Sequence, residues 1–210
     1  MRQGPVPMAH WVLARHHGTP ALLMRQQTFV LALLGLVQAA AVAAPFKQTL
    51  SLQGVTFEVQ AKGDGSTQVL QVRAHRGLKP YPLVKQELIG QVVGAEVEDL
   101  NSDGRPELVV MVQSAGSGSY GSVQAWSAGP HRLEPIPPMG DLSGADARGY
   151  MGHDSFNVVE TSLVRQFPIY KSSDSNARAS GGTRQILYKM VPAPGGWRFQ
   201  PVRSTDLATP

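Results

Sequence analysis

The sequence predicts an all-β protein, either an antiparallel β-sandwich or a partly closed barrel, formed as a single domain. Short segments with alternating or continuous β-branched residues recur along the chain, and clusters of Gly, Pro, Asn and Asp separate them. No long segment shows the apolar period of an amphipathic helix. About ten short strands with regularly spaced turns are typical of sandwiches and barrels.

In the first half of the chain, strands are predicted at residues 47–52, 55–60 and 68–73. Residues 83–93 are ambiguous, because a strand broken near Gly90 and a short helix both fit the pattern. Residues 107–113, with the sequence ELVVMVQ, are apolar enough for a buried central strand. Residues 120–127 are expected to be the antiparallel partner of this strand.

In the second half, the strand pattern continues after residue 130. Two polar, Gly-rich or Ser-rich segments, 141–152 and 171–182, are predicted to be long loops. The remaining strands are expected at 131–136, 155–159, 163–168, 183–191 and 197–202. Neither half has an obvious core of its own, so we expect one domain.

The N-terminal segment has the layout of a secretory signal peptide at residues 24–43. Arg25 provides the basic start, residues 29–37 form the apolar run, and Ala41-Val42-Ala43 fits an A-x-A cleavage site. The apolar run is too short for a membrane-spanning helix. Residues 1–23 are then either an upstream extension annotated in error or a genuine extended leader. A periplasmic or secreted location is expected, with residues 44–210 as the mature domain.

Charge and cysteine content narrow the classes of partner. Of the 19 Lys and Arg, three lie in residues 1–43, which leaves 16 against 15 Asp and Glu in the mature chain. This near balance, without a basic stripe, gives no reason to expect nucleic-acid binding. We also expect no membrane association after signal cleavage. The chain has no cysteine, so the exported domain must be stabilised by core packing alone.

An acidic turn at Asp99–Glu107 fits the pattern D-x-N-x-D-G-x-x-E. Alternating oxygen ligands with a Gly at the sixth position suit a hard cation such as Ca²⁺. The pattern resembles the calcium loops of FG-GAP repeats, although it lacks the twelfth-position Glu of an EF-hand. A β-turn with Asp and Asn caps is the competing interpretation. The candidate ligands are the side chains of Asp99, Asn101, Asp103 and Glu107 and the backbone carbonyl of Arg105.

A second motif follows in the connection between the two central strands. Ser117, Gly118, Ser119 and Tyr120 place hydroxyl groups on a loop whose other residues have little bulk. Such a loop, here called the SGSY loop, can enter a narrow cleft and donate hydrogen bonds to carboxylates. A generic flexible hairpin connection is the alternative, because Ser and Gly are common turn residues.

The segment from Glu98 to Trp126, EDLNSDGRPELVVMVQSAGSGSYGSVQAW, resembles the periplasmic inhibitors of I-type (invertebrate-type) lysozyme. Their signature is an S-G-x-Y loop, preceded by an acidic turn and a β-branched strand, and Ser117–Tyr120 matches it residue by residue. A Phe-x-Gln-x-Leu segment at Phe46–Leu50 adds to the likeness. The resemblance is clearest over residues 87–133, and the chain continues beyond residue 141 with a C-terminal β extension, about 141–210.

The resemblance implies a protein that blocks an I-type lysozyme and is not itself an enzyme. The hydroxyls of Ser117 and Tyr120 would donate to the paired carboxylates with which lysozymes cleave glycan. No cofactor is required by this function. A calcium-binding extracellular β module with an interaction role is the alternative from another class. Exposed strand edges leave a homodimer possible.

Other chemistry-bearing residues give weaker signals. His153 and Asp154 beside Ser155 suggest a hydrolase, but no G-x-S-x-G motif occurs, and neighbours on a strand point to opposite faces. Four residues in the C-terminal strands are expected to be solvated or to form cross-strand pairs: Arg165, Tyr170, Arg184 and Tyr188. Trp126 and Trp197 are expected in the core.

Overall fold

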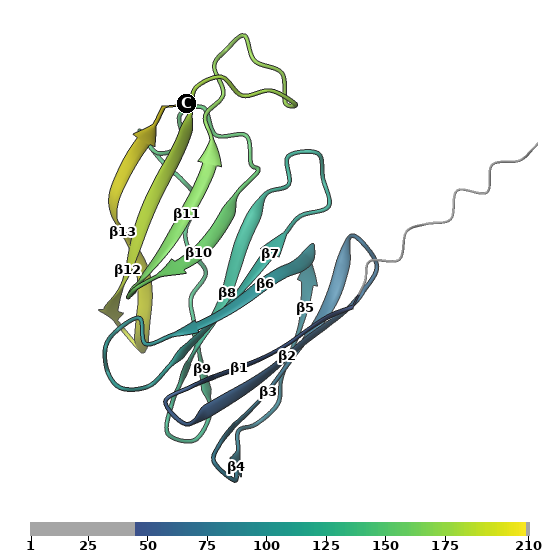
Figure 1. The fold of residues 1–210 in the computed structure, drawn as a ribbon, viewed down its shortest axis with the longest axis vertical. Helices are drawn as coiled ribbons and strands as arrows, with labels where there is room; N and C mark the ends of the chain where they lie inside the picture. The colour runs from purple at the N-terminus through teal and green to yellow at the C-terminus, as the bar shows by residue number, and fades with distance from the viewer. Residues whose placement is uncertain (1–44, 209–210) are drawn as a thin grey trace, which may run out of the picture. The chain divides into compact units, whose positions relative to one another are not determined.

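The computed structural model describes residues 45–208, which form thirteen strands in three antiparallel sheets (Figure 1). The predicted all-β fold is confirmed, in the form of open sheets stacked as in a sandwich. Within residues 45–208, no helix is long and apolar enough to cross a membrane. The leader predicted at 1–23 and the signal peptide predicted at 24–43 lie outside the described residues, so these boundaries stay predictions.

The first sheet contains five strands around β3. Strand β3 pairs with β2 along one edge and with both β4 and β5 along the other, while β1 pairs with β2. The strands are β1 (Phe46–Leu52), β2 (Val55–Gly63), β3 (Thr67–Arg76), β4 (Lys79–Pro80) and β5 (Val84–Ile89).

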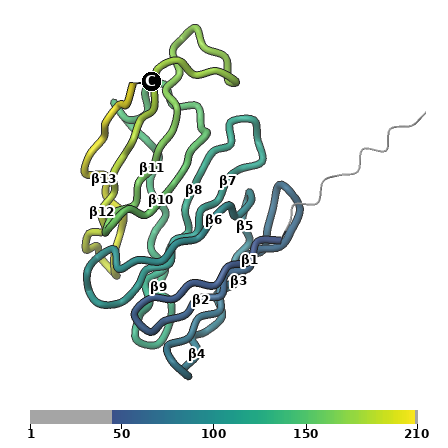
Figure 2. Tube along the Cα trace, in the orientation of Figure 1, coloured from purple at the N-terminus to yellow at the C-terminus, as the bar shows by residue number. Residues whose placement is uncertain are grey.

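The second sheet has four strands in sequence order and carries both predicted motifs. The acidic turn connects β6 to β7, and the SGSY loop connects β7 to β8 (Figure 2). The strands are β6 (Gln91–Glu98), β7 (Glu107–Gln113), β8 (Gly121–Ala128) and β9 (Leu133–Ile136).

The third sheet is a second four-stranded meander and accounts for the C-terminal extension. Its strands are β10 (Ser155–Val159), β11 (Ser162–Pro168), β12 (Thr183–Ala193) and β13 (Gly196–Leu207). The loops predicted at 141–152 and 171–182 contain no strand. Strand β13 extends to Leu207, beyond the predicted end at residue 202, because its second half continues to pair with β12 after a bulge at Leu187 and Tyr188.

The second sheet lies between the other two, and successive side chains of β7 are buried alternately in two different cores. Leu108, Val110 and Val112 belong to a core shared with the first sheet, whereas Val109 and Met111 belong to a core shared with the third. Successive side chains of a strand point to opposite faces, so β7 is buried on both. Its continuous apolar sequence therefore follows from its central position, as predicted.

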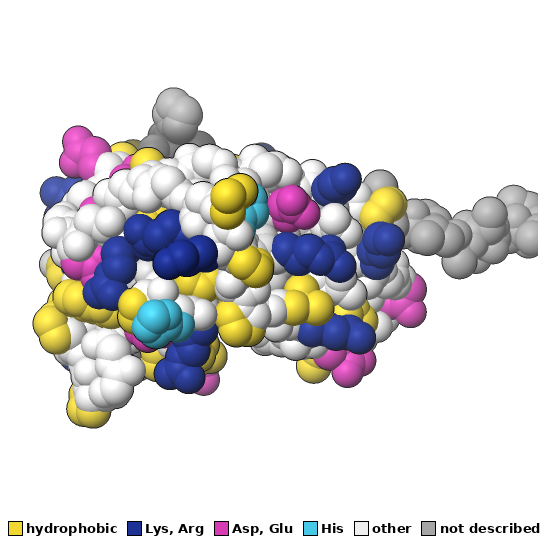
Figure 3. All heavy atoms as spheres, turned by 90° about the horizontal axis from the view of Figure 1, so that it is seen from below, with side chains coloured by type: hydrophobic (Ala, Val, Ile, Leu, Met, Phe, Trp, Pro, Cys, Tyr) yellow, Lys and Arg dark blue, Asp and Glu magenta, His cyan; other side chains and the backbone are white. Residues whose placement is uncertain are grey.

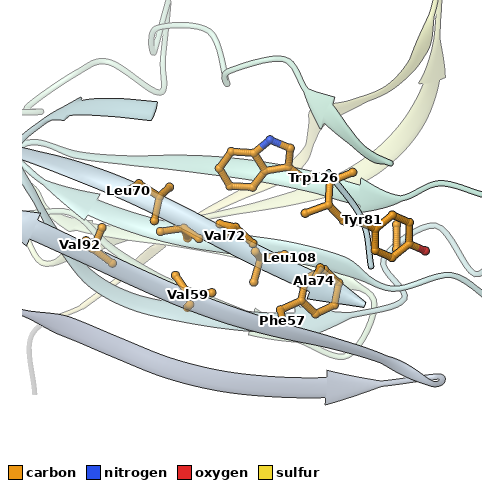
Figure 4. Close-up of a cluster of buried hydrophobic side chains, with 14 of the residues drawn as sticks. Phe57, Val59, Leu70, Val72, Ala74, Tyr81, Val92, Leu108 and Trp126 are labelled. Carbon is orange, nitrogen blue, oxygen red and sulfur yellow. The ribbon is translucent and has the colours of Figure 1, made fainter. Parts of the chain in front are cut away.

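The two cores have different compositions. The core between the first and second sheets is mainly aliphatic, and its buried aromatic residues are Phe57, Tyr81 and Trp126 (Figure 4). The core between the second and third sheets has more aromatic residues, including Phe156, Phe167 and Phe199. Trp126 is buried, and the half-buried Trp197 packs against the second core, so the core positions predicted for both are confirmed.

The ambiguous segment 83–93 is a broken strand. Gly90 separates β5 from β6 with a φ of +117°, a conformation that favours glycine. A Cβ at this position would lie 2.5 Å from the carbonyl oxygen of Gln113. Gly90 thus allows the chain to leave the first sheet and enter the second.

Candidate functional site

The SGSY loop is closed at its base by hydrogen bonds between its two ends. The backbone N–H of Ser114 donates to the carbonyl oxygen of Tyr120 at 2.9 Å, and the N–H of Tyr120 donates to Ser114 Oγ at 2.9 Å. Within the loop, the N–H of Ser119 donates to the carbonyl of Gly116 at 2.8 Å. Ser119 has a φ of +42°, so the loop includes a left-handed residue next to Tyr120.

Segments from the C-terminal region hold the loop from outside. The N–H of His153 donates to the carbonyl oxygen of Gly118 at 2.6 Å, and Asn176 Nδ2 donates to the carbonyl of Ser117 at 3.1 Å. A Cβ on Gly152, whose φ is +91°, would lie 2.0 Å from the carbonyl oxygen of Gly118. The backbones of the two loops therefore meet closely because Gly152 has no side chain.

Gly118 is buried beneath Tyr120. A Cβ at Gly118 would lie 2.5 Å from Cε2 of Tyr120 and 3.2 Å from the carbonyl oxygen of Met151. The second residue of the SGSY loop must therefore be small for the Tyr120 ring to keep its position. This gives the Gly of the motif a packing role beyond conformational freedom.

The hydroxyl groups of the loop face solvent. Ser117 is exposed and Tyr120 is 51% exposed, while the edge of its ring contacts Tyr150 with a centroid distance of 5.7 Å. Among the hydrogen bonds between described residues, none involves Ser117 Oγ or the Tyr120 hydroxyl. Both groups are thus available to a partner, on a backbone that is held in place.

A buried polar network lies directly behind the loop and is centred on Asp154. Its Oδ2 accepts from the backbone N–H of Gly121 at 2.8 Å and from the hydroxyl of Tyr150 at 2.7 Å. Its Oδ1 accepts from Arg165 Nε at 2.7 Å, in an ion pair whose side chains are 0% and 7% exposed. Arg165 Nη2 also donates to the Tyr150 hydroxyl at 2.8 Å. We call these residues, Tyr150, Asp154 and Arg165, the Asp154 network.

The guanidinium of Arg165 is surrounded by aromatic rings. Its Cζ lies 5.0 Å from the centroid of Tyr150, 5.6 Å from that of Phe167 and 5.7 Å from that of Phe156. Burial by itself lowers the pKa of Arg165, but the charge of Asp154 and the hydrogen bond to it raise that pKa above its ordinary value. Burial and the hydrogen bond to Asp154 raise the pKa of Tyr150. The network therefore holds one anion, one cation and one neutral phenol.

These contacts modify two of the sequence interpretations. Arg165 is buried at 6% exposure and its ionic partner is Asp154, which lies outside the strands, so it is neither solvated nor part of a cross-strand pair. Arg184, in contrast, forms the expected cross-strand pair with Asp206. His153 and Asp154 precede β10 and do not lie on a strand, and the carboxylate of Asp154 accepts from three donors, none of which is the His153 ring.

Sequence reasoning missed the residues that support the loop, namely Tyr150, Gly152 and Asn176 together with the Asp154–Arg165 pair. They lie about 30 to 60 positions beyond the loop in the sequence, as the separations of 33 and 59 residues in the two hydrogen bonds show. One signal was present: Arg165 lies at an alternate position between the apolar Leu163 and Phe167, and therefore on the same face of the strand. A charge at such a position usually has a buried partner.

The acidic turn is closed by its own donors. Asp99 Oδ1 and Oδ2 accept from the backbone N–H groups of Asp103 and Gly104 at 3.0 and 2.9 Å. Asn101 Oδ1 accepts from the N–H of Asp103 at 2.9 Å. Asp103 accepts from the N–H of Arg105 at 2.9 Å and from its guanidinium at 3.0 Å. This is the pattern of capped turns, which was the alternative to a calcium loop.

Glu107 is the first residue of β7, and its side chain is buried. The residue is 0% exposed and accepts from Ser127 Oγ at 2.7 Å, from the N–H of Leu100 at 2.8 Å and from Asn101 Nδ2 at 3.3 Å. Burial raises its pKa to about 7, against the opposing effect of the hydrogen bonds from Ser127 and Leu100. Glu107 therefore anchors the turn to β8.

The predicted calcium ligands hydrogen-bond to one another. No group of three or more His, Cys, Asp or Glu in residues 45–208 could hold a metal ion. The side-chain amide of Asn101 donates toward Asp103 and Glu107, and an N–H donor between two carboxylates does not suit a cation. The calcium interpretation is therefore not supported by this arrangement.

A groove of about 450 Å³ adjoins the SGSY loop. Its walls come from Tyr120 and β8 on one side and from the segment Pro138–Leu142 on the other, with Tyr150 and Arg165 contributing to its lining. The exposed loop, the groove and the buried network behind them thus form one continuous region. This region is suited to contact another macromolecule, and its main feature is the pair of free hydroxyls.

Comparison with known proteins finds one protein family that is similar to this region. Residues 83–148 match the family model described as PliI, periplasmic lysozyme inhibitor of I-type lysozyme. The chain resembles the periplasmic inhibitors of I-type lysozyme. A periplasmic or secreted location, as predicted, fits this family. The matched segment includes both the acidic turn and the SGSY loop, but it ends before Asp154 and the third sheet.

Solved structures give matches of lower similarity. The crystal structure of PliI-Ah, the periplasmic lysozyme inhibitor of I-type lysozyme from Aeromonas hydrophyla, has 29% identity and a TM-score of 0.42, covering 48% of this chain and 92% of that chain. The N-terminal domain of Nup159 has 14% identity and a TM-score of 0.30, covering 74% of this chain and 45% of that one. These TM-scores are too low to establish a shared fold. Comparison with curated proteins finds no match.

Proposed function

We propose that the protein is a stoichiometric inhibitor of an I-type lysozyme and acts by inserting the SGSY loop into the active-site cleft. The match of residues 83–148 to the inhibitor family supports the inhibitor role, and that family is one of inhibitors rather than enzymes. The observation that carries the proposed mechanism is the pair of solvent-facing hydroxyls, Ser117 Oγ and the Tyr120 hydroxyl, on a loop held by backbone hydrogen bonds.

The chemistry of the target explains why hydroxyls are suited to this task. Lysozymes cleave glycan with a pair of carboxyl groups. Hydroxyl donors to an ionised carboxylate form short, charge-assisted hydrogen bonds. The buried Gly118 keeps the loop narrow, because the ring of Tyr120 packs directly over it.

The support behind the loop contributes to affinity through preorganisation. The contacts from His153, Asn176 and Asp154 fix the backbone of the loop before it meets an enzyme. A loop that is already ordered loses less conformational entropy on binding. The C-terminal extension would thus contribute to inhibition by holding the loop in place.

The test is a titration of I-type lysozyme activity with mature protein and with Ser117→Ala and Tyr120→Phe. Each substitution removes one donor that has no partner within the described residues, so the fold should be unaffected. Each should weaken inhibition by roughly 5- to 150-fold, the equivalent of about 1–3 kcal/mol. Ser204→Ala, an exposed serine on β13 away from the groove, is the matched control. Full lysozyme activity at a micromolar excess of wild-type protein would refute the inhibitor role.

A further inference from the structure

A second site candidate lies between two turns that the SGSY loop does not involve. The β3–β4 turn and the β8–β9 turn enclose a pocket of about 170 Å³. Six residues line it, and none is acidic: Arg76, Lys79, Pro80, Tyr81, Pro130 and His131. The pocket belongs neither to the loop nor to the Asp154 network.

A neutral partner fixes the guanidinium of Arg76 in this pocket. Arg76 Nε donates to the hydroxyl of Tyr81 at 3.2 Å, and that hydroxyl donates to the carbonyl oxygen of Gly129 at 2.9 Å. Tyr81 is buried at the end of the first core, so it is a rigid anchor (Figure 4). The cation is therefore held in position by a neutral partner, and it forms no ion pair within residues 45–208.

The hydrogen-bonding capacity of Arg76 is incompletely used. Its Nη2 nitrogen is buried and has no acceptor among the described residues. A buried donor without an acceptor is costly, and more so when it is charged. An acceptor supplied by a ligand would remove this cost.

Other cationic or donor groups surround the same pocket. Lys79 and His131 are exposed, and none of the ion pairs within residues 45–208 involves Arg76, Lys79 or His131. Lys, Arg and His side chains are prominent on the face seen in Figure 3, which looks toward the end where β4 and the β8–β9 turn lie in Figure 1. The pocket thus combines one fixed guanidinium with an ammonium and an imidazole, and no acidic residue lines it.

We infer that this pocket binds a phosphate group, free or carried on a larger molecule. Guanidinium groups match the oxygen spacing of phosphate, and a lysine ammonium contributes a point charge from another direction. Donors on three separate side chains suit a tetrahedral oxyanion better than a planar carboxylate. The pocket is small, so it accommodates one such group rather than an extended ligand.

Titration calorimetry with inorganic phosphate at constant ionic strength tests this assignment. Wild-type mature protein should bind phosphate saturably with a Kd of about 1 mM or tighter. Arg76→Gln and Lys79→Gln should each raise the Kd at least about tenfold, because each removes a charge-assisted interaction. Lys47→Gln, an exposed lysine of β1, should leave the Kd unchanged. Lys79 is exposed, so its variant should fold even if Arg76→Gln does not.

Two further binding measurements, with acetate and with lipid vesicles, identify the class of ligand and its source. Acetate should bind at least about tenfold more weakly than phosphate. Binding to phosphatidylcholine vesicles only when they contain phosphatidic acid, and only with Lys79 intact, would assign a lipid-carried phosphate. Phosphate binding without vesicle binding would assign the free ion. No saturable phosphate binding, equal affinity for acetate, or a Kd unchanged in both variants would overturn the inference. Lysozyme inhibition by Lys79→Gln should equal that of wild type, which separates this site from the SGSY loop.

Discussion

Replacing Asp154 by Asn tests whether the buried network behind the SGSY loop stabilises the fold. Three donors point at the two carboxylate oxygens: the N–H of Gly121, the hydroxyl of Tyr150 and Nε of Arg165. An amide has one acceptor oxygen and two donor hydrogens. In either orientation, its NH₂ group faces at least one of these donors, and the charge of Arg165 loses its counterion.

The size of the effect follows from the burial of the pair. The side chains of Asp154 and Arg165 are 0% and 7% exposed, so water cannot replace the lost partner. Breaking a buried ion pair by removing one member costs about 3–5 kcal/mol. For a chain of this length, 1 kcal/mol corresponds to roughly 2–4 °C, so the Tm should fall by about 6–20 °C.

Urea and thermal unfolding of the mature protein, followed by circular dichroism, measure this loss. Asp141→Asn, the same substitution at an exposed aspartate, is the control and should change stability by less than about 0.5 kcal/mol. The double variant Asp154→Leu with Arg165→Met leaves no unpaired buried charge and should be more stable than Asp154→Asn, although the N–H of Gly121 and the hydroxyl of Tyr150 still lose their acceptor. A loss below about 1 kcal/mol in Asp154→Asn would refute the argument, because that is the cost of an ordinary hydrogen bond.

Three other expectations concern single residues. The pKa of Glu107 is raised to about 7, so between about pH 4.5 and 7 the folded state keeps a proton that the unfolded state releases. The free energy of unfolding should therefore fall by about 3 kcal/mol as pH rises from 4.5 to above 7. Urea unfolding should show this fall in wild type but not in Glu107→Gln. Gly118→Ala should displace the Tyr120 ring and weaken lysozyme inhibition at least about tenfold. Gly116→Ala is the control, because the space around its Cβ position is open, and it should inhibit as wild type does. Equal inhibition by the two variants would contradict the packing argument. Gly90→Ala, at a φ of +117°, should lower the unfolding free energy by at least about 1 kcal/mol, and an unchanged urea midpoint would show that the break between β5 and β6 tolerates a side chain.

Strand positions could be predicted from the sequence because each strand pairs with neighbours along the chain. The apolar run of β7 indicated a central strand buried on both faces, and the Gly and Pro clusters marked the turns. The SGSY loop was also visible, since its motif lies within one hairpin. Local patterns are sufficient for features of this kind.

Contacts between sheets could not be predicted in the same way. The ion pair of Asp154 with Arg165 and the contact of Asn176 with Ser117 depend on how the third sheet packs against the second. No periodicity records which loop meets which strand across such an interface. The acidic turn shows a related limit: Asp, Asn and Gly at the same spacing serve both a cation and a self-capped turn, and only the positions of the donors distinguish the two.

The burial of β7 between two cores has a consequence for how the chain folds as it emerges. All pairings are between strands close in sequence, so each sheet can form as soon as its own residues are available. The first and second sheets can therefore assemble from residues 46–136 while the third is still absent. During that interval Val109, Met111 and Val123 face water, and this intermediate is vulnerable to aggregation until β10–β13 arrive to cover them.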